Sequence, residues 1–241
     1  MHRELFETWH ASDSVPSWPC TREQCNGVFR PVEDSAKKPN SYASSARMDY
    51  EGYHPELDVG RYSMVLKCSA CGDPAVTVGT WGHQMWDLQD SWEYVECMYP
   101  KYILPPIPMI SVPPDCSVKV KESLTDAFQI YWSSPGNAAN SIRIGLERLM
   151  DDLGVQSHNG TKALVLHERI AKYRVTRPDI ADCLEAAKWV GNSGSHGSPV
   201  THENVLDVLE IVEHALAQIY PKDHSHIVAK AAKIIAAKGP A

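Results

Sequence analysis

The apolar positions change their spacing part-way along the chain. Before residue 100, short runs rich in β-branched and aromatic residues are bounded by Gly, Pro and Asp, which is typical of strands. Strands are predicted for three of these runs: residues 61–67, 75–81 and 92–99. After residue 118, apolar residues recur three or four positions apart, which is typical of amphipathic helices. The pattern therefore predicts an α+β protein, with a small N-terminal β module followed by an all-α antiparallel helical bundle.

Turn and capping residues divide the second half of the chain into helices. Helices are expected in six places: residues 121–132, residues 137–153, a shorter one capped by Thr161, residues 178–190, a long one capped by Thr201, and a last one after Pro221. The connections between them are short, which favours antiparallel neighbours. The last helix carries Lys230, Lys233 and Lys238, and these lysines form either a docking element or a solvated face.

Six prolines lie between residues 100 and 114, which argues against a helix or a central strand there. We therefore expect an extended connector that separates two units. The predicted organisation has three parts: residues 1–103 as a zinc-ribbon-like β module, 104–118 as a proline-rich linker, and 119–241 as the helical bundle. Residues 1–19 are expected to be a weakly structured lead-in. Residues 31–56 are polar and are expected to form an exposed insertion within the β module.

Four of the seven cysteines form two close pairs. Cys20 and Cys25 are separated by four residues, and Cys68 and Cys71 are separated by two. Two such pairs, each on a tight turn, are the pattern of a four-cysteine zinc ribbon, in which four thiolates bind one tetrahedral Zn²⁺. Four thiolates close the coordination shell, so the ion would be structural. The alternative is a buried pair of free thiols whose spacing arose by chance.

Composition narrows the class of protein. The chain has 241 residues, 43% of them hydrophobic, so it is long enough to bury a substantial core. Its net charge of −7, without blocks of like charge, argues against broad nonspecific binding of nucleic acid. No signal peptide or membrane-spanning run is recognisable, so we expect a soluble cytoplasmic protein with no membrane partner. We find no phosphate-binding loop, dinucleotide fingerprint or nucleophile elbow, and we expect no small-molecule cofactor.

Polar residues with catalytic potential gather around the glycine-rich stretch 189–197. Asn192 can donate and accept hydrogen bonds, and His196 titrates near neutral pH. The stretch is either a helix C-cap at Gly191 followed by a polar loop, or a functional turn that presents Asn192 and His196.

A charged pair lies on the predicted helix 137–153. Arg143 and Glu147 are four positions apart and flank the apolar stripe of that helix. They form either a surface ion pair or a partly buried pair that reaches the glycine-rich stretch.

Together these segments resemble a bacterial family known as domain of unknown function 4145. The resemblance spans about residues 104–220 and rests on the following segments: Leu104-Pro105, Asn140 to Glu147, Leu166 to Ile170, and Trp189 to Asn192 with His196. The family pattern includes an Arg-x3-Glu helix and a Gly-Asn-x3-His turn. Its members often carry an N-terminal zinc ribbon, as the cysteines suggest here.

The resemblance implies a helical bundle of the HEPN superfamily. Many HEPN proteins are metal-independent ribonucleases, are typically dimers, and occur in phage defence, toxin–antitoxin and restriction systems. By this resemblance His196 is the candidate general acid/base, Asn192 the orienting residue, and Arg143 with Glu147 the supporting charged pair. The usual Arg-x4–6-His motif lacks its arginine, because Trp189, Val190 and Gly191 occupy the positions where it would stand.

Two functions from different classes follow from this departure. The first is a zinc-stabilised interaction protein with a HEPN-like bundle, which acts as an accessory or sensor subunit in bacterial anti-phage defence or a restriction-associated system. Its expected partners are a second copy of the chain or the other subunits of a complex. The alternative is a metal-independent endoribonuclease with a composite site of His196, Asn192 and Arg143, whose substrate is RNA.

Overall fold

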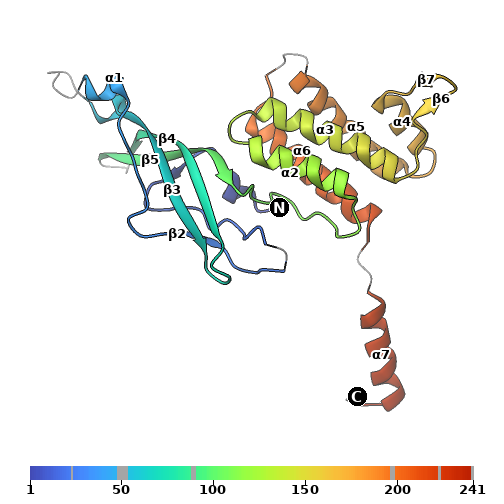
Figure 1. Ribbon diagram of the computed structural model, residues 1–241. Helices are drawn as coiled ribbons and strands as arrows, with labels where there is room; N and C mark the ends of the chain where they lie inside the picture. The colour runs from blue at the N-terminus through green and yellow to red at the C-terminus, as the bar shows by residue number, and fades with distance from the viewer. Residues whose placement is uncertain (23, 48–53, 88–90, 196–198, 222–223, 240–241) are drawn as a thin grey trace.

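A computed structural model defines the fold (Figure 1) and describes every residue except 23, 48–53, 88–90, 196–198, 222–223 and 240–241. The protein is mixed α+β, as the sequence predicts. A curled antiparallel sheet lies on one side of the molecule and a group of packed helices on the other (Figure 1). The described residues form seven α-helices in all, the shortest of which lies beside the sheet.

The sheet is built around three consecutive long strands. They are β3 (Val59–Cys68), β4 (Pro74–Asp87) and β5 (Trp92–Leu104), and each contains one of the predicted strands. Two short strands, β1 (His10–Ala11) and β2 (Phe29–Pro31), complete the order β1-β5-β4-β3-β2, in which every pair is antiparallel. The prediction of three strands is confirmed, and all three are longer than expected.

The prediction that residue 100 lies outside a strand was wrong. Pro100 belongs to β5, where it pairs with Gly79 next to a shift in register. Strand β1 pairs only with Met98 and Cys97 of β5, so Pro100 lies beyond the two-residue contact between these strands. Proline is tolerated at an irregular or unpaired position of a sheet, because no ladder hydrogen bond from its nitrogen is needed there.

The helices of the second half follow the predicted order. Their bounds are α2 (Val118–Ile130), α3 (Pro135–Asp152), α4 (Leu166–Tyr173), α5 (Pro178–Ser195), α6 (His202–Ile219) and α7 (Ser225–Ala237). The predicted cap of α6 is confirmed, since the Thr201 side chain accepts a hydrogen bond from the Asn204 backbone N–H at 3.2 Å. Helices α2, α3, α5 and α6 pack against one another, and α4 packs on α5 and α3.

One predicted cap was wrong. Thr161 lies in the turn between two short strands, β6 (His158–Asn159) and β7 (Lys162–Ala163), and caps no helix. Helix α4 begins three residues after β7, where the Glu168 carboxylate accepts a hydrogen bond from the Val165 N–H at 3.0 Å. A capping glutamate within the first turn thus sets the start of α4.

The N-terminal segment is part of the core rather than a weakly structured lead-in. It contains a 3-10 helix (Arg3–Phe6), and the side chains of Phe6 and Trp18 are buried. Tyr131, the C-cap residue of α2, donates a hydrogen bond to the Phe6 carbonyl at 2.9 Å, and Trp18 donates one to the Leu5 carbonyl at 2.7 Å. Aromatic packing with satisfied polar atoms therefore fixes the segment against α2.

The proline-rich segment also contributes to the core. It has no regular secondary structure after Leu104, yet Ile107, Met109 and Ile110 are buried. These side chains belong to one hydrophobic cluster that runs from the sheet into the helices. The sheet and the helices are therefore joined by shared packing as well as by the chain itself.

The insertion at residues 31–56 is largely exposed where it is described. It carries the four-residue helix α1 (Tyr42–Ser45) and a 3-10 helix follows it at Pro55–Leu57. Isolated bridges from Lys37 to Ser63 and from Asn40 to Gly60 lay this segment along β3. The insertion thus covers an edge of the sheet.

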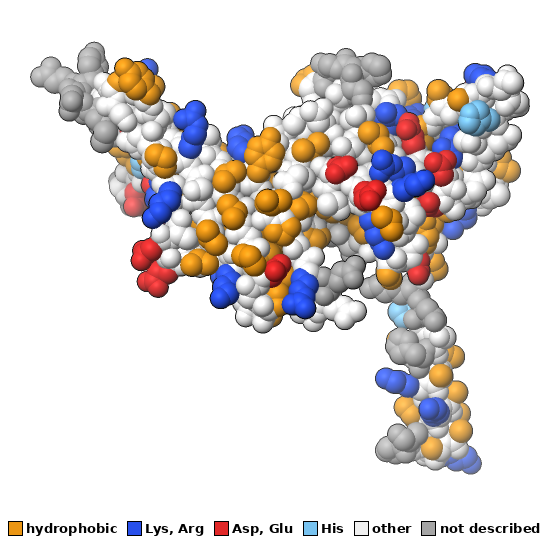
Figure 2. Space-filling view, viewed as in Figure 1, with side chains coloured by type: hydrophobic (Ala, Val, Ile, Leu, Met, Phe, Trp, Pro, Cys, Tyr) orange, Lys and Arg blue, Asp and Glu red, His pale blue; other side chains and the backbone are white. Residues whose placement is uncertain are grey.

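Among the described residues, exposed apolar side chains gather on the sheet and on α7. The outer face of the sheet shows a patch of large apolar side chains on three neighbouring strands (Figure 2): Val65, Val76, Val78, Tyr102 and Leu104. The second surface is α7, which extends away from the other helices (Figure 1). Within the described part of the chain, no helix combines the length and the apolar character needed to cross a bilayer.

We expect Ile107→Ala to destabilise the whole molecule, because Ile107 is fully buried in the shared cluster. Truncation of such a side chain costs about 2–5 kcal/mol of the free energy of unfolding. Urea denaturation followed by both tryptophan fluorescence and circular dichroism measures this. Val175→Ala is the matched control, since Val175 is 85% exposed. If the unfolding midpoint measured by fluorescence falls while the midpoint measured by circular dichroism is unchanged, the sheet and the helices are energetically independent.

Candidate metal centre and polar helix junction

Four cysteines from separate segments meet at one end of the sheet. Cys20 and Cys25 come from the loop between β1 and β2, Cys68 ends β3, and Cys71 lies in the turn before β4. All four sulfur atoms lie within 4.8 Å of one another. The structure thus brings together every cysteine predicted as a metal ligand, and the group can hold a metal ion.

The distances between the sulfur atoms distinguish a metal centre from disulfides. The Sγ atoms of Cys20 and Cys71 are 3.7 Å apart, and those of Cys25 and Cys68 are 3.6 Å apart. A disulfide requires about 2.05 Å, and all seven cysteines are free thiols. Thiolates around a tetrahedral ion at about 2.3 Å would lie about 3.8 Å from each other, so the observed spacing fits such an ion.

The backbone supports a thiolate at Cys68, whereas burial raises the pKa of Cys20. The Sγ of Cys68 accepts a hydrogen bond from the Ala70 N–H at 3.4 Å, and Cys20 accepts one from the Arg22 N–H at 3.5 Å. Hydrogen bonds from the backbone at Cys71 and Ala70 lower the pKa of Cys68 to about 6. A bound cation would favour the thiolate form of all four residues.

A glycine is required beside the cluster. A Cβ atom on Gly27 would lie 2.5 Å from the Cys68 Sγ, which is too close for any side chain. The turn after the first cysteine pair can therefore approach the second pair only because residue 27 has no side chain.

The candidate charged pair lies where α3 meets α5. Arg143 donates through Nη1 to Glu147 at 2.5 Å and through Nε to the Asn140 side chain at 3.3 Å. Arg143 is 25% exposed and Glu147 40%, so the pair lies at the edge of the helix contact. The Arg143 side chain also packs against α5, since a Cβ on Gly191 would lie 2.6 Å from the Arg143 Cβ.

The glycine-rich stretch begins as a helix rather than as a turn. Helix α5 continues to Ser195, five residues beyond its predicted end, so Gly191 is not a C-cap and Asn192 lies within the helix. Gly191 and Gly194 face α3 at Arg143 and Gly136, and the absence of side chains there lets the two helices pack closely. Asn192 is half-buried one position after Gly191. The candidate general acid/base, His196, lies outside the described residues.

Sequence reasoning missed a second polar cluster next to this junction. The Lys188 side chain is only 4% exposed, and its ammonium lies 3.1 Å from His167 Nδ1 and 3.4 Å from Glu185. It also lies 4.0 Å from the centre of the Trp189 ring. The spacing of Glu185 and Lys188 on one helix can be read from the sequence. His167 belongs to α4, and its contact with Lys188 could not be predicted without the tertiary structure.

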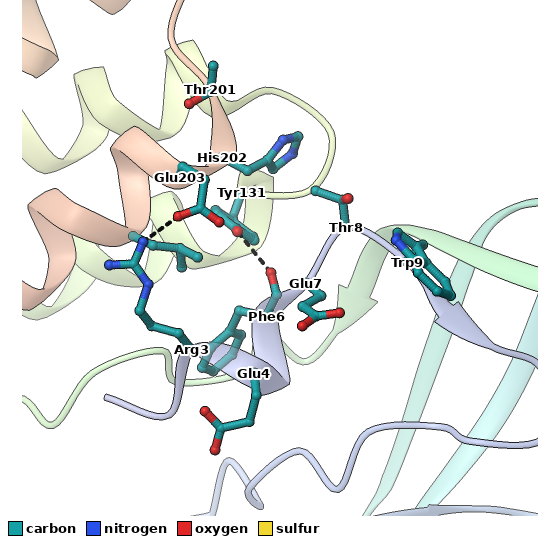
Figure 3. Close-up of a pocket in the computed structure, with 11 residues that line it drawn as sticks. Arg3, Glu4, Phe6, Glu7, Thr8, Trp9, Tyr131, Thr201, His202 and Glu203 are labelled. Carbon is teal, nitrogen blue, oxygen red and sulfur yellow. Dashed lines mark hydrogen bonds and ion pairs between the residues drawn. The ribbon is translucent and has the colours of Figure 1, made fainter. Parts of the chain in front are cut away.

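An open cavity of about 520 Å³ separates the N-terminal segment from α6 (Figure 3). Arg3 reaches across to the carboxylates of α6, with Glu203 at 2.5 Å, Asp207 at 2.8 Å and Glu210 at 3.0 Å. His202 lies in the wall, and burial lowers its pKa. These ion pairs hold the N-terminal residues against α6. We assign no chemistry to the cavity.

Comparison with known proteins places the helical part in a family context. Residues 125–237 match the model of a family described as "Domain of unknown function (DUF4145)". The match supports the resemblance inferred from the sequence and runs from α2 into α7, whereas the four cysteines lie outside it. No curated protein and no solved structure matches the chain.

We expect Gly191→Ala to separate α3 from α5, because the added methyl group would meet Arg143 and the Ala139 carbonyl. Overpacking of this kind costs about 1–3 kcal/mol of the free energy of unfolding. Gly136→Ala is the control, since its Cβ would meet its nearest neighbours at an ordinary 3.7 Å. Equal stability of the two variants in chemical denaturation would show that the contact is loose.

Proposed function

We propose that the protein is a zinc-stabilised interaction protein with a HEPN-like bundle, which serves as an accessory or sensor subunit in bacterial anti-phage defence or a restriction-associated system. The observation that carries this proposal is the closed set of four cysteine sulfurs. Four thiolates complete a tetrahedral shell and leave no open position for a substrate, so the ion acts on folding rather than on chemistry.

Zinc is the ion that this donor set fits best. Four sulfur ligands in a tetrahedral arrangement are typical of structural zinc or of iron–sulfur chemistry. The sulfur–sulfur distances of 3.6 and 3.7 Å match the edge of a single-ion tetrahedron. The short strands β1 and β2 supply little core of their own, so binding of the ion would contribute directly to folding.

The surface and the charged pair favour interaction over catalysis. The guanidinium of Arg143 is held by Glu147 and Asn140. Two of its five N–H donors are thus engaged within its own helix, which leaves fewer of them for a phosphate. By contrast, the five apolar side chains on the outer face of the sheet form the kind of contiguous exposed patch that marks protein–protein contact sites.

Protein purified without chelators should contain about one zinc ion per chain. Cys68→Ser should lower this content and the thermal stability, because binding free energy at such a site is folding free energy. Metal content is measured by mass spectrometry and stability by calorimetry. Cys183→Ser is the control, because Cys183 lies outside the cluster. Wild-type protein without bound metal, or equal metal content in both variants, would contradict the site.

A ribonuclease is the second candidate, and one contact favours it. Gly191 of α5 packs on Arg143 of α3. Asn192 is the next residue of α5, so it lies close to the same helix contact. A composite site of Arg143, Asn192 and His196 would need no metal, since the arginine would supply the charge that stabilises the transition state.

Under the proposed function, wild-type protein should not cleave a panel of structured RNAs in magnesium-free buffer. Cleavage assays with Arg143→Ala, Asn192→Ala and His196→Ala provide the comparison. Arg177→Ala is the control, because Arg177 pairs only locally with Asp179. Wild-type cleavage that falls about a hundredfold or more in the three site variants, and persists in the control, would establish the ribonuclease instead.

A further inference from the structure

Helix α7 is an amphipathic helix whose apolar side chains are exposed. Every residue from Ser225 to Lys238 whose side chain is described is exposed. Apolar side chains share one side of the helix at helical spacing: Ile227, Val228, Ala231, Ile234 and Ile235. An isolated helix of 13 residues is marginal in water, so its stability depends on covering this stripe.

The body of the molecule offers an apolar groove of about 740 Å³. We call it the proline groove, because Pro105, Pro106, Pro108 and Pro114 line it. Helix α2 forms the opposite wall with Lys121, Thr125 and Phe128. The Lys121 ammonium is already bonded to the Pro114 carbonyl at 2.7 Å, so it is engaged within the groove.

The charges of the helix and of the groove are complementary. Helix α7 and its cap carry Lys230, Lys233 and Lys238 and no acidic residue. Removing these three charges from the net charge of −7 leaves −10 on the rest of the chain. Three exposed carboxylates directly follow lining residues of the groove: Asp115, Glu122 and Asp126.

We propose that α7 of one molecule docks in the proline groove of a second copy, and that the exchange is reciprocal. The apolar stripe would cover the prolines and Phe128, while Lys230, which borders the stripe, would face the carboxylates along α2. In Figure 1, α7 points away from the body, so its stripe is presented to another molecule rather than to its own. A two-fold exchange forms the contact twice, which is a low-cost route to a dimer.

The position of the groove also links the dimer to the metal centre. Thr21 and Gln24, from the loop that carries Cys20 and Cys25, line its other end. The side chain of Tyr220, just after α6, interacts with the buried Cys116, which lies two residues after the lining residue Pro114. The chain therefore leaves α6 close to the groove, and the metal-bearing loop forms one of its walls.

Sedimentation velocity across a wide range of protein concentration tests the stripe. The wild type should dimerise, and Ile234→Asp should weaken the dimer at least about tenfold, because the stripe would then bury a charge. Ala229→Asp introduces the same charge on another side of the helix and should have a much smaller effect. Circular dichroism should show equal helix content in the two variants.

Charge reversal tests the groove. The variant Lys230→Glu and the variant Glu122→Lys/Asp126→Lys should each dimerise more weakly than the wild type, because Lys230 borders the apolar stripe of α7. An equimolar mixture of the two should recover the dimer, because both exchanged contacts in the mixed pair are again complementary. Docking within one chain would not be rescued by mixing.

Several results would overturn the proposal. One is a wild type that stays monomeric, including a monomer whose α7 is protected from proteolysis by docking in its own chain. Another is a dimer that resists Ile234→Asp. A third is a monomer that binds phosphatidylglycerol vesicles in a flotation assay and loses this binding in Ile234→Asp. This inference deepens the proposed interaction function by naming a second copy as partner, and its failure would leave the zinc measurement untouched.

Discussion

The meeting of four cysteine sulfurs is the constraint on which the N-terminal half depends. The sulfur contacts join residues far apart in the sequence: Cys25 and Cys68 are 43 residues apart, and Cys20 and Cys71 are 51 residues apart. Between β1 and β3 the described residues have little regular structure, and the strand among them, β2, has three residues. A metal ion bound by all four thiolates would fix this irregular loop to the end of β3 and thereby fix the register of β2 against β3.

The effect of that constraint extends into the helices because the core is continuous. Trp18 lies two residues before Cys20 and packs edge-on against Trp132, which follows α2. Phe6 packs against the same tryptophan, and the Phe6 carbonyl accepts a hydrogen bond from the Tyr131 hydroxyl. We therefore expect a change at the cysteine cluster to reach α2 through these aromatic side chains, because they are closely packed.

The sequence predicted the elements better than their connections. The β-branched and aromatic residues in 61–67 and the helical spacing in 137–153 are local signals, and the corresponding elements β3 and α3 appear where they were expected. The cysteine cluster was equally predictable, since its ligands are close pairs with turn residues beside them. The role of the proline-rich segment was not, because prolines report local backbone restrictions and say nothing about whether Ile107 between them finds a hydrophobic partner.

Glycine was the most misleading signal in the candidate catalytic region. Three glycines near a predicted helix end favour a turn, yet Gly191 and Gly194 lie within α5. Glycine is needed at these two positions because α3 approaches α5 too closely for side chains there. The same approach presses Arg143 against α5 and holds it beside Glu147. An arginine that is packed and paired in this way stabilises a helix contact, and these bonds use two of its five N–H donors. Arg143 and Glu147 therefore contribute to the packing of this junction, whatever else the junction does.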